Sequence, residues 1–126
     1  MDEKEDFMVN KDSIDAALAA HSQWKKRLQD AIATHRSEFD PAVVKRDNAC
    51  QFGQWLHGLP PQDKVSEDFK RVRDLHAEFH KVTGEILELA LSGRKDDALH
   101  QLEAGGSYGS ASGKLVLALQ GWKAKL

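Results

Sequence analysis

Four side chains that can bind a metal ion stand at spacings that favour one shared site. His76 and His80 are four residues apart, and on a helix this spacing places both imidazoles on the same face. His21 falls in register with the apolar residues of an earlier segment, so we expect it to point inward. Cys50 is the only cysteine of the chain. Three imidazoles and one thiolate form a ligand set that suits tetrahedral Zn²⁺.

Each of these residues taken alone also fits a simpler role. A buried histidine is often a hydrogen-bonded core residue, and a lone cysteine is often a small buried hydrophobe. Three imidazoles directed into one core would all need polar partners, and a divalent ion provides a common one. With four protein ligands the coordination shell is closed, which is typical of a structural or sensing site rather than a catalytic one. His35, His57 and His100 lie near helix ends or on polar faces, and we expect them at the surface.

Enzymatic sites are not indicated. Glu78 follows His76 by two residues and should point roughly 200° away from it around a helix, whereas the His-Glu-x-x-His motif of metalloproteases needs the glutamate directly after the first histidine. We find no nucleophile with an adjacent base and no glycine-rich phosphate loop. A di-iron bundle would need several inward carboxylates, and the apolar stripes carry almost none. We therefore expect no enzyme and keep the di-iron bundle as a less favoured alternative.

The elements that position these residues are all predicted to be helices. Apolar residues recur every three or four positions, and glycine and proline separate the segments. The predicted helices cover residues 11–36, 49–56, 64–91, 95–103 and 108–125. Asp12 or Ser13 is expected to cap the first helix, and Val65 to begin the apolar stripe of the third. The expected fold is all-α, an antiparallel four-helix bundle with an additional short helix that carries Cys50.

Composition and charge narrow the class of protein. The chain has 126 residues and a formal net charge of -2. We expect a flexible segment over residues 1–10 and one helical domain over 11–126. No basic stripe is present, so nucleic acid is not an expected partner. No apolar stretch approaches the roughly 20 residues that span a bilayer, and the acidic N-terminus is not a secretory signal. Together with a lone cysteine, these features favour a cytoplasmic domain without membrane contact.

Three segments around the candidate ligands resemble the chemoreceptor zinc-binding domain family. They are Ala20–Lys25, Asp47–Leu56 and Leu75–His80, and the run Cys-x-Phe-Gly-x-Trp-Leu from Cys50 is the most specific. The resemblance covers roughly residues 12–122. It implies a helical bundle and a three-histidine, one-cysteine zinc site made by His21, Cys50, His76 and His80.

The resemblance also implies a function. Domains of this family are attached to chemotaxis receptors and to diguanylate cyclases, are reported to sense zinc or hypochlorous acid, and tend to form dimers. We therefore expect a regulatory zinc sensor that signals to chemotaxis or cyclic-di-GMP output, acting on a receptor or cyclase in cis or in trans. Trp24, Trp55 and Trp122 exceed the obvious needs of a small core, which favours a homodimer. A zinc bundle that is purely structural and only dimerises is the alternative. Asp47 is the expected acidic partner of a zinc-bound histidine.

Overall fold

The computed structural model describes residues 9–126, and helices are the regular secondary structure of this part of the chain. The helices are α2 (Lys11–Ser22), α3 (Trp24–Thr34), α4 (Pro41–Val44), α5 (Gln51–His57), α6 (Glu67–Leu91), α7 (Lys95–Leu102) and α8 (Ser107–Ala124), with a 3-10 turn over Pro61–Asp63. Of the expected flexible segment 1–10, residues 1–8 lie outside the described residues. Val9 packs against the core, and Asn10 caps α2.

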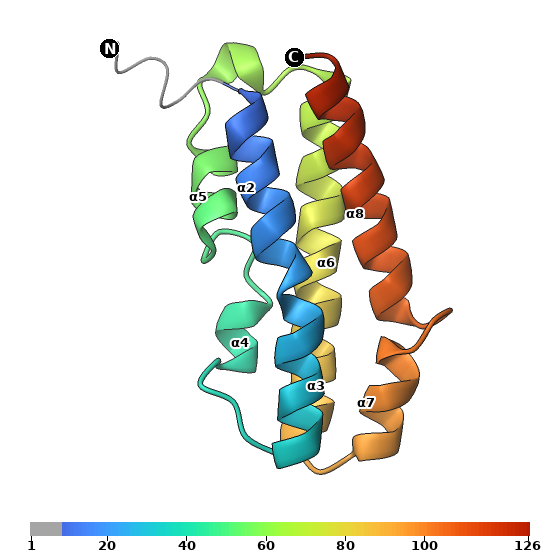
Figure 1. Cartoon of the computed structure of the whole chain (residues 1–126). Coiled ribbons are helices and arrows are strands. Elements are labelled where there is room, and N and C mark those ends of the chain that lie inside the picture. Colours follow the sequence, from blue (N-terminus) through green and yellow to red (C-terminus); the bar gives the residue numbers. More distant parts are fainter. Residues whose placement is uncertain (1–8) are drawn as a thin grey trace.

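The helices form four columns that run up and down alternately (Figure 1). α2 and α3 stack end to end in the first column, and α4 and α5 return along the second. The 25-residue helix α6 is the third, and α7 with α8 is the fourth. α6 makes its most extensive contact with α8 and also packs against α3, α4 and α7. The all-α bundle with a short helix at Cys50 is therefore confirmed.

Side-chain caps and turns set the ends of the helices. Asn10 accepts a hydrogen bond from the Ser13 amide at 2.8 Å, so the expected cap at Asp12 or Ser13 is wrong. Ser66 caps α6 by accepting from the Phe69 amide at 3.1 Å. The single helix predicted over 11–36 is divided at Gln23, which keeps a right-handed conformation and lets α3 continue the column of α2. His35, with φ 57°, ends α3 in the left-handed region.

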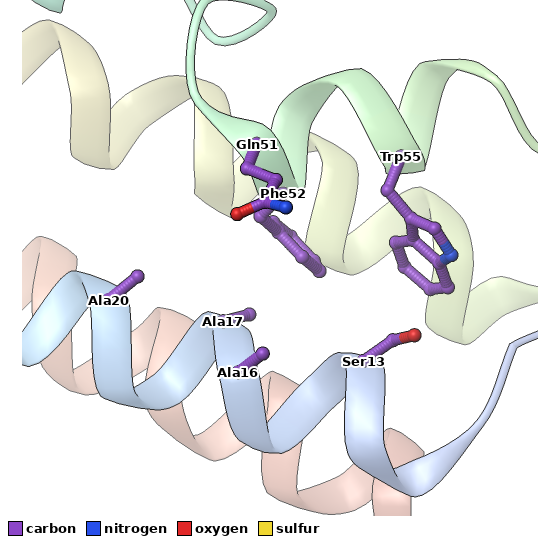
Figure 2. A pocket seen from close by; sticks show the side chains of 7 residues that line it. All are labelled: Ser13, Ala16, Ala17, Ala20, Gln51, Phe52 and Trp55. Atoms are coloured by element: carbon purple, nitrogen blue, oxygen red, sulfur yellow. The ribbon is translucent and has the colours of Figure 1, made fainter. Parts of the chain in front are cut away.

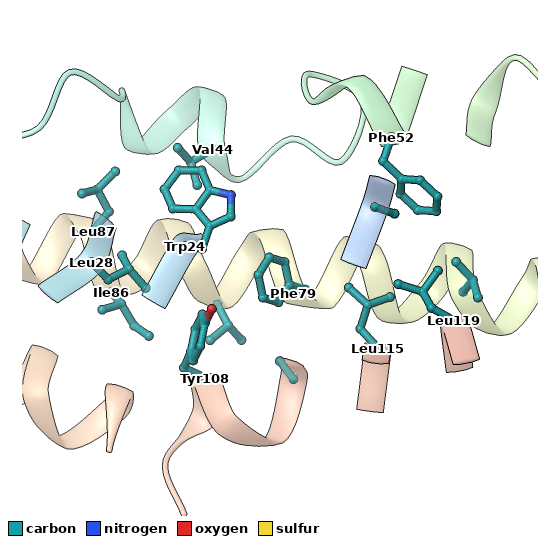
Figure 3. Packing of buried hydrophobic residues seen from close by; sticks show 14 of the residues in the cluster. Trp24, Leu28, Val44, Phe52, Phe79, Ile86, Leu87, Tyr108, Leu115 and Leu119 are labelled. Atoms are coloured by element: carbon teal, nitrogen blue, oxygen red, sulfur yellow. The ribbon is translucent and has the colours of Figure 1, made fainter. Parts of the chain in front are cut away.

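The core lies between α6 and the three other columns (Figure 3). Leu28, Phe79, Ile86, Leu115 and Leu119 are fully or almost fully buried. Burying a side chain of this size contributes about 1.5–3 kcal/mol, so these contacts hold the columns together.

Two expectations about apolar side chains are corrected. Val65 is 70 % exposed because it precedes the first turn of α6 instead of lying within the helix. Trp24 and Trp122 are buried in the core of the chain itself, and Trp55 packs near Trp122 with ring centroids 6.2 Å apart. The tryptophans therefore do not leave a surplus of aromatic surface, and this reason for a dimer does not hold.

Glycines make α8 a weak helix when taken alone. Gly109, Gly113 and Gly121 all lie within it, and at each of them a Cβ atom would meet nothing within 4 Å. Each glycine in a helix interior costs about 0.5–1 kcal/mol relative to alanine. The helix is held by its buried face, which includes Leu115 and Leu119. Among the described residues, none of the helices has the length and apolar character needed to cross a membrane.

Candidate metal centre

The structure brings His21, Cys50, His76 and His80 together in the middle of the bundle. His21 lies in the last turn of α2, Cys50 is the N-cap of α5, and the other two lie on α6. One potential ligand atom from each of the four lies within 4.8 Å of all the others. Three separate segments thus converge on one point, as the sequence predicts.

The two histidines of α6 form the most deeply buried half of the site. His76 is 0 % and His80 3 % exposed, and their ring centroids are 4.5 Å apart. Nδ1 of His80 lies 2.9 Å from the carbonyl oxygen of Val44. A carbonyl oxygen only accepts, so Nδ1 carries the hydrogen and Nε2 keeps its lone pair.

A glycine allows α4 to lie close enough for this hydrogen bond. A Cβ atom at Gly84 would lie 3.1 Å from the Pro41 carbonyl oxygen and 3.2 Å from the Lys45 nitrogen, with the Lys45 side chain closer still. A side chain at position 84 would therefore push α4 outward. The Val44 carbonyl would move with it and lose its place beside His80.

His21 is held in the same way from its own helix. Its Nδ1 lies 2.7 Å from the carbonyl oxygen of Ala17, so Nε2 again keeps its lone pair. Its ring meets those of His76 and His80 edge-on, with centroids 5.1 and 5.5 Å away. A metal-binding histidine commonly donates its second ring nitrogen to a carbonyl or carboxylate, which fixes its orientation. His21 and His80 both show this arrangement.

Cys50 comes from a tight loop that ends at α5. Its Sγ accepts a hydrogen bond from the Gly53 amide at 3.3 Å and lies 3.4 Å from Nε2 of both His76 and His80. Gly53 is packed against the loop: a Cβ atom there would lie 2.8 Å from the Asp47 carbonyl carbon, and nearer to its oxygen. Glycine at position 53 is thus what lets the loop carry Cys50 toward α6.

Burial makes the centre electrically neutral and rich in lone pairs. Desolvation lowers the pKa of His21 to about 4 and that of His76 to about 2. It also lowers the pKa of His80, and the hydrogen bond to Val44 opposes this shift in part. For Cys50, desolvation raises the pKa of the thiol, against the hydrogen bonds from the amides at the start of α5. At neutral pH the three imidazoles are therefore uncharged and able to bind a cation.

The geometry fits a metal ion better than a purely hydrogen-bonded cluster. The thiol has one hydrogen and can donate it to one imidazole only, yet Sγ is equidistant from two Nε2 atoms. With bonds of about 2.3 Å to sulfur and 2.0–2.1 Å to nitrogen, a tetrahedral zinc site has sulfur–nitrogen edges of about 3.5 Å. The observed distances of 3.4 Å match this value. Nδ1 of His76 is buried without a hydrogen-bond partner, unlike Nδ1 of His21 and of His80.

Comparison with known protein families gives a match. The family model of the chemoreceptor zinc-binding domain matches residues 21–87, which is just over half of the chain and includes all four candidate ligands. The chain belongs to this family. Neither the curated proteins nor the solved structures yielded a match.

As a chemoreceptor zinc-binding domain, the chain is a member of a regulatory family, and its three-histidine, one-cysteine cluster can hold a metal ion. The match is shorter than the resemblance over 12–122 suggested, and it leaves out α7 and α8. The structure gives a physical reason for part of the motif that begins at Cys50. Gly53 is needed for close packing against Asp47, and Phe52 is buried against the rings of His21 and His76.

The expected hydrogen bond from a candidate ligand histidine to the Asp47 carboxylate is not observed. This carboxylate lies 3.2 Å from Nε2 of His57 at the end of α5 instead of binding a ligand histidine. The carbonyl oxygens of Ala17 and Val44 accept from His21 and His80 instead. Sequence reasoning missed them because backbone groups leave no residue-specific signal. His35 and His100 are exposed and away from the cluster, as expected. His57 is also exposed, and its pairing with Asp47 ties the loop before Cys50 to the end of α5.

Proposed function

We propose that this domain is a regulatory sensor in which His21, Cys50, His76 and His80 bind one zinc ion. Zinc bound there supplies a positive charge that keeps the Cys50 sulfur as a thiolate at neutral pH. One observation carries the proposal: four ligand atoms from three segments lie within 4.8 Å of one another. Two of the imidazoles are already oriented by backbone carbonyls.

The short helix α5 with Cys50 is the part of the site suited to move. It has seven residues, and its closest backbone contacts are with α2, while Phe52 and Trp55 reach the rings of His76 and Trp122. Figure 2 shows small side chains of α2 facing Phe52 and Trp55 across a cavity of about 160 Å³. Trp55 Nε1 has no hydrogen-bond partner. Because α6 supplies two ligands and α5 contributes only one, loss of the Cys50 bond frees α5 and leaves His76 and His80 in place.

Two inputs suit this arrangement. The first is the zinc concentration, since a ligand present at 1,000 times its dissociation constant stabilises the folded state that binds it by about 4 kcal/mol. The second is an oxidant such as hypochlorous acid. The Cys50 thiolate would be oxidised by two electrons to a sulfenic acid as the oxidant is reduced to chloride, and this step is reversible by thiols. A sulfenic acid is a weaker ligand, so Cys50 and α5 would be released.

The experiment that tests this proposal measures zinc release and helix content in the same sample. Hypochlorous acid is added at a near-equimolar ratio while a chromogenic chelator reports zinc and far-UV circular dichroism reports helicity. We expect zinc to be released or bound less tightly with helicity largely kept. If zinc stays bound, or if Cys50→Ser responds as the parent does, oxidant sensing is wrong and zinc sensing replaces it. If helicity is lost together with zinc, the metal is a structural element and the sensor proposal fails.

Elemental analysis separates this proposal from a di-iron bundle, with one zinc per chain expected against two irons. The buried polar side chains of residues 9–126 are His21, His76, His80 and Thr83. No buried carboxylate is among them, and a di-iron site needs several.

We further propose that the domain acts in the cytoplasm, as a homodimer, on a chemotaxis receptor or a diguanylate cyclase in cis or in trans. The family description supports the chemoreceptor part. Leu117 on α8 is 70 % exposed, beside the half-buried Leu75 of α6, and these side chains give a dimer an apolar contact. Light scattering of the parent and of Leu117→Glu tests this. A monomeric parent at high micromolar concentration contradicts the dimer.

A further inference from the structure

A second cavity opens directly onto the candidate metal centre. It encloses about 210 Å³ between α3, α4 and the start of α5. Since a water molecule occupies about 30 Å³ in the liquid, there is room for a small organic molecule. Cys50, His21 and His80 lie along its inner wall. The cavity on the other side of α5, between α2 and α5, contacts none of these three residues.

The cavity reaches the one candidate ligand that is not buried. His21, His76 and His80 are 8 %, 0 % and 3 % exposed, whereas Cys50 is half-buried. Cys50 is therefore the candidate ligand that a molecule in the cavity can approach without unfolding α6. Trp24, Phe39 and Val43 contribute apolar surface to the walls of the cavity.

Two arginines give the cavity a positive charge. Arg27 lies over the rings of Trp24 and Phe39, with 4.9 Å from its guanidinium carbon to each centroid. This stacking holds the guanidinium at the wall of the cavity. The same guanidinium donates a hydrogen bond to the side-chain oxygen of Gln23 at 3.0 Å. Arg46 also lines the cavity and is exposed. Neither arginine pairs with a carboxylate within the described residues, and no Asp or Glu lines the cavity.

We propose that this cavity is a binding site for small anions with a compact apolar body, and that it presents them to the sulfur of Cys50. Positive charge in a cleft with low-dielectric walls concentrates anions, and the apolar walls suit a ligand that also carries an apolar body. Reagents that reach Cys50 are thereby selected by charge and size before any reaction occurs. The inference deepens the proposed sensing function by naming the chemical class that enters, and it rests on that function only in assigning Cys50 as the responsive residue.

The test compares two thiol reagents of nearly equal size, iodoacetate and iodoacetamide, which differ by one negative charge. In both reactions the Cys50 thiolate forms a carbon–sulfur bond as the carbon–iodine bond breaks and iodide leaves. Mass spectrometry gives the two alkylation rates for the full chain as purified. The ratio of the iodoacetate rate to the iodoacetamide rate in the folded chain is divided by the same ratio in the chain unfolded in urea. Cys50 is the only thiol, so every rate belongs to it.

We expect this normalised ratio to exceed about threefold at low salt and to approach one at 1 M salt, where the Debye length is about 3 Å. Arg46→Glu should lower it severalfold, whereas Arg71→Glu, the same charge change on an exposed residue outside this cavity, should not. Val43→Trp should slow both reagents. A ratio of one, equal effects of the two arginine variants, or failure of both reagents to react in the folded chain would each overturn the proposal. Zinc content is measured separately, so the anion site and the zinc assignment can fail independently.

Discussion

Replacing Gly53 with alanine tests whether the loop before α5 sets the position of Cys50. The variant removes no candidate ligand and adds one methyl group. In the parent, a Cβ at this position would lie 2.8 Å from the Asp47 carbonyl carbon. Ordinary carbon–carbon contact distances are about 3.5–4.0 Å, and the Asp47 carbonyl oxygen would lie nearer still, so the loop must retreat by about 1 Å or more. Cys50 lies between the two points of contact and must move as well.

This displacement is large on the scale of metal coordination. Ligand distances in metal sites hold to within about 0.2 Å, so a shift of roughly 1 Å strains or breaks the sulfur bond. Overpacking of this kind typically costs about 1–3 kcal/mol. The metal-free variant relaxes this strain by moving the loop, and zinc binding has to restore it, so the cost appears in the binding free energy. Since about 1.4 kcal/mol is a factor of ten, we expect zinc affinity to fall about 5- to 150-fold.

A chelator-competition titration measures this affinity, and Gly113→Ala is the matched control. At Gly113, also in a helix, a Cβ would meet nothing within 4 Å, so this variant should keep the parent affinity and gain about 0.5–1 kcal/mol of stability. In a Cys50→Ala background, Gly53→Ala should cause little further loss of affinity, because its effect passes through the sulfur. Equal affinities of Gly53→Ala and Gly113→Ala would refute this reasoning, and so would full additivity with Cys50→Ala.

Three further predictions concern the same centre. Gly84→Ala should move α4 and the Val44 carbonyl, and weaken zinc binding by about tenfold, measured by the same titration; no change would mean that the carbonyl does not orient His80. Cys50→Ala should lower the zinc-dependent gain in unfolding temperature, and an unchanged gain in a thermal melt would remove Cys50 from the ligand set. In the metal-free chain, the pKa of His21 near 4 against an ordinary 6.5 means that the unfolded chain binds protons first as the pH falls. The free energy of unfolding should therefore decrease from pH 6.5 toward pH 4, and urea unfolding curves that coincide over this range would contradict the pKa shift.

The sequence predicts which side chains form the candidate ligand cluster, because side-chain identity and helical spacing are local properties. His76 and His80 share a face at any helix position, and His21 follows the apolar stripe of its own segment. The order and approximate extent of the five predicted helices also follow from glycine and proline, whereas α4 (Pro41–Val44) is absent from the prediction, which has a connection there. The division of the first helix at Gln23 cannot be predicted in this way, because Gln23 keeps helical backbone angles and is neither glycine nor proline.

The groups that orient the candidate ligands are harder to predict from the sequence. The carbonyls of Ala17 and Val44 belong to the backbone, and their identity depends on how α4 is placed against α6. Gly84 and Gly53 were the available signals, since a glycine inside an apolar helix often marks close approach of another segment. The pairing of Asp47 with His57 shows why closeness in sequence to Cys50 did not predict a contact with the cluster. The Asp47 carboxylate faces the far end of α5 instead.

The glycines of α8 have a consequence for how the state of the centre can be observed. With Gly109, Gly113 and Gly121 in its interior, α8 owes its helicity to contact with α6, the helix that carries His76 and His80. A disturbance of α6 at the centre should therefore appear as faster amide hydrogen exchange along α8, although no residue of α8 belongs to the candidate ligand set. The backbone amides of α8 thus provide a remote, label-free report on whether α6 is disturbed at the centre.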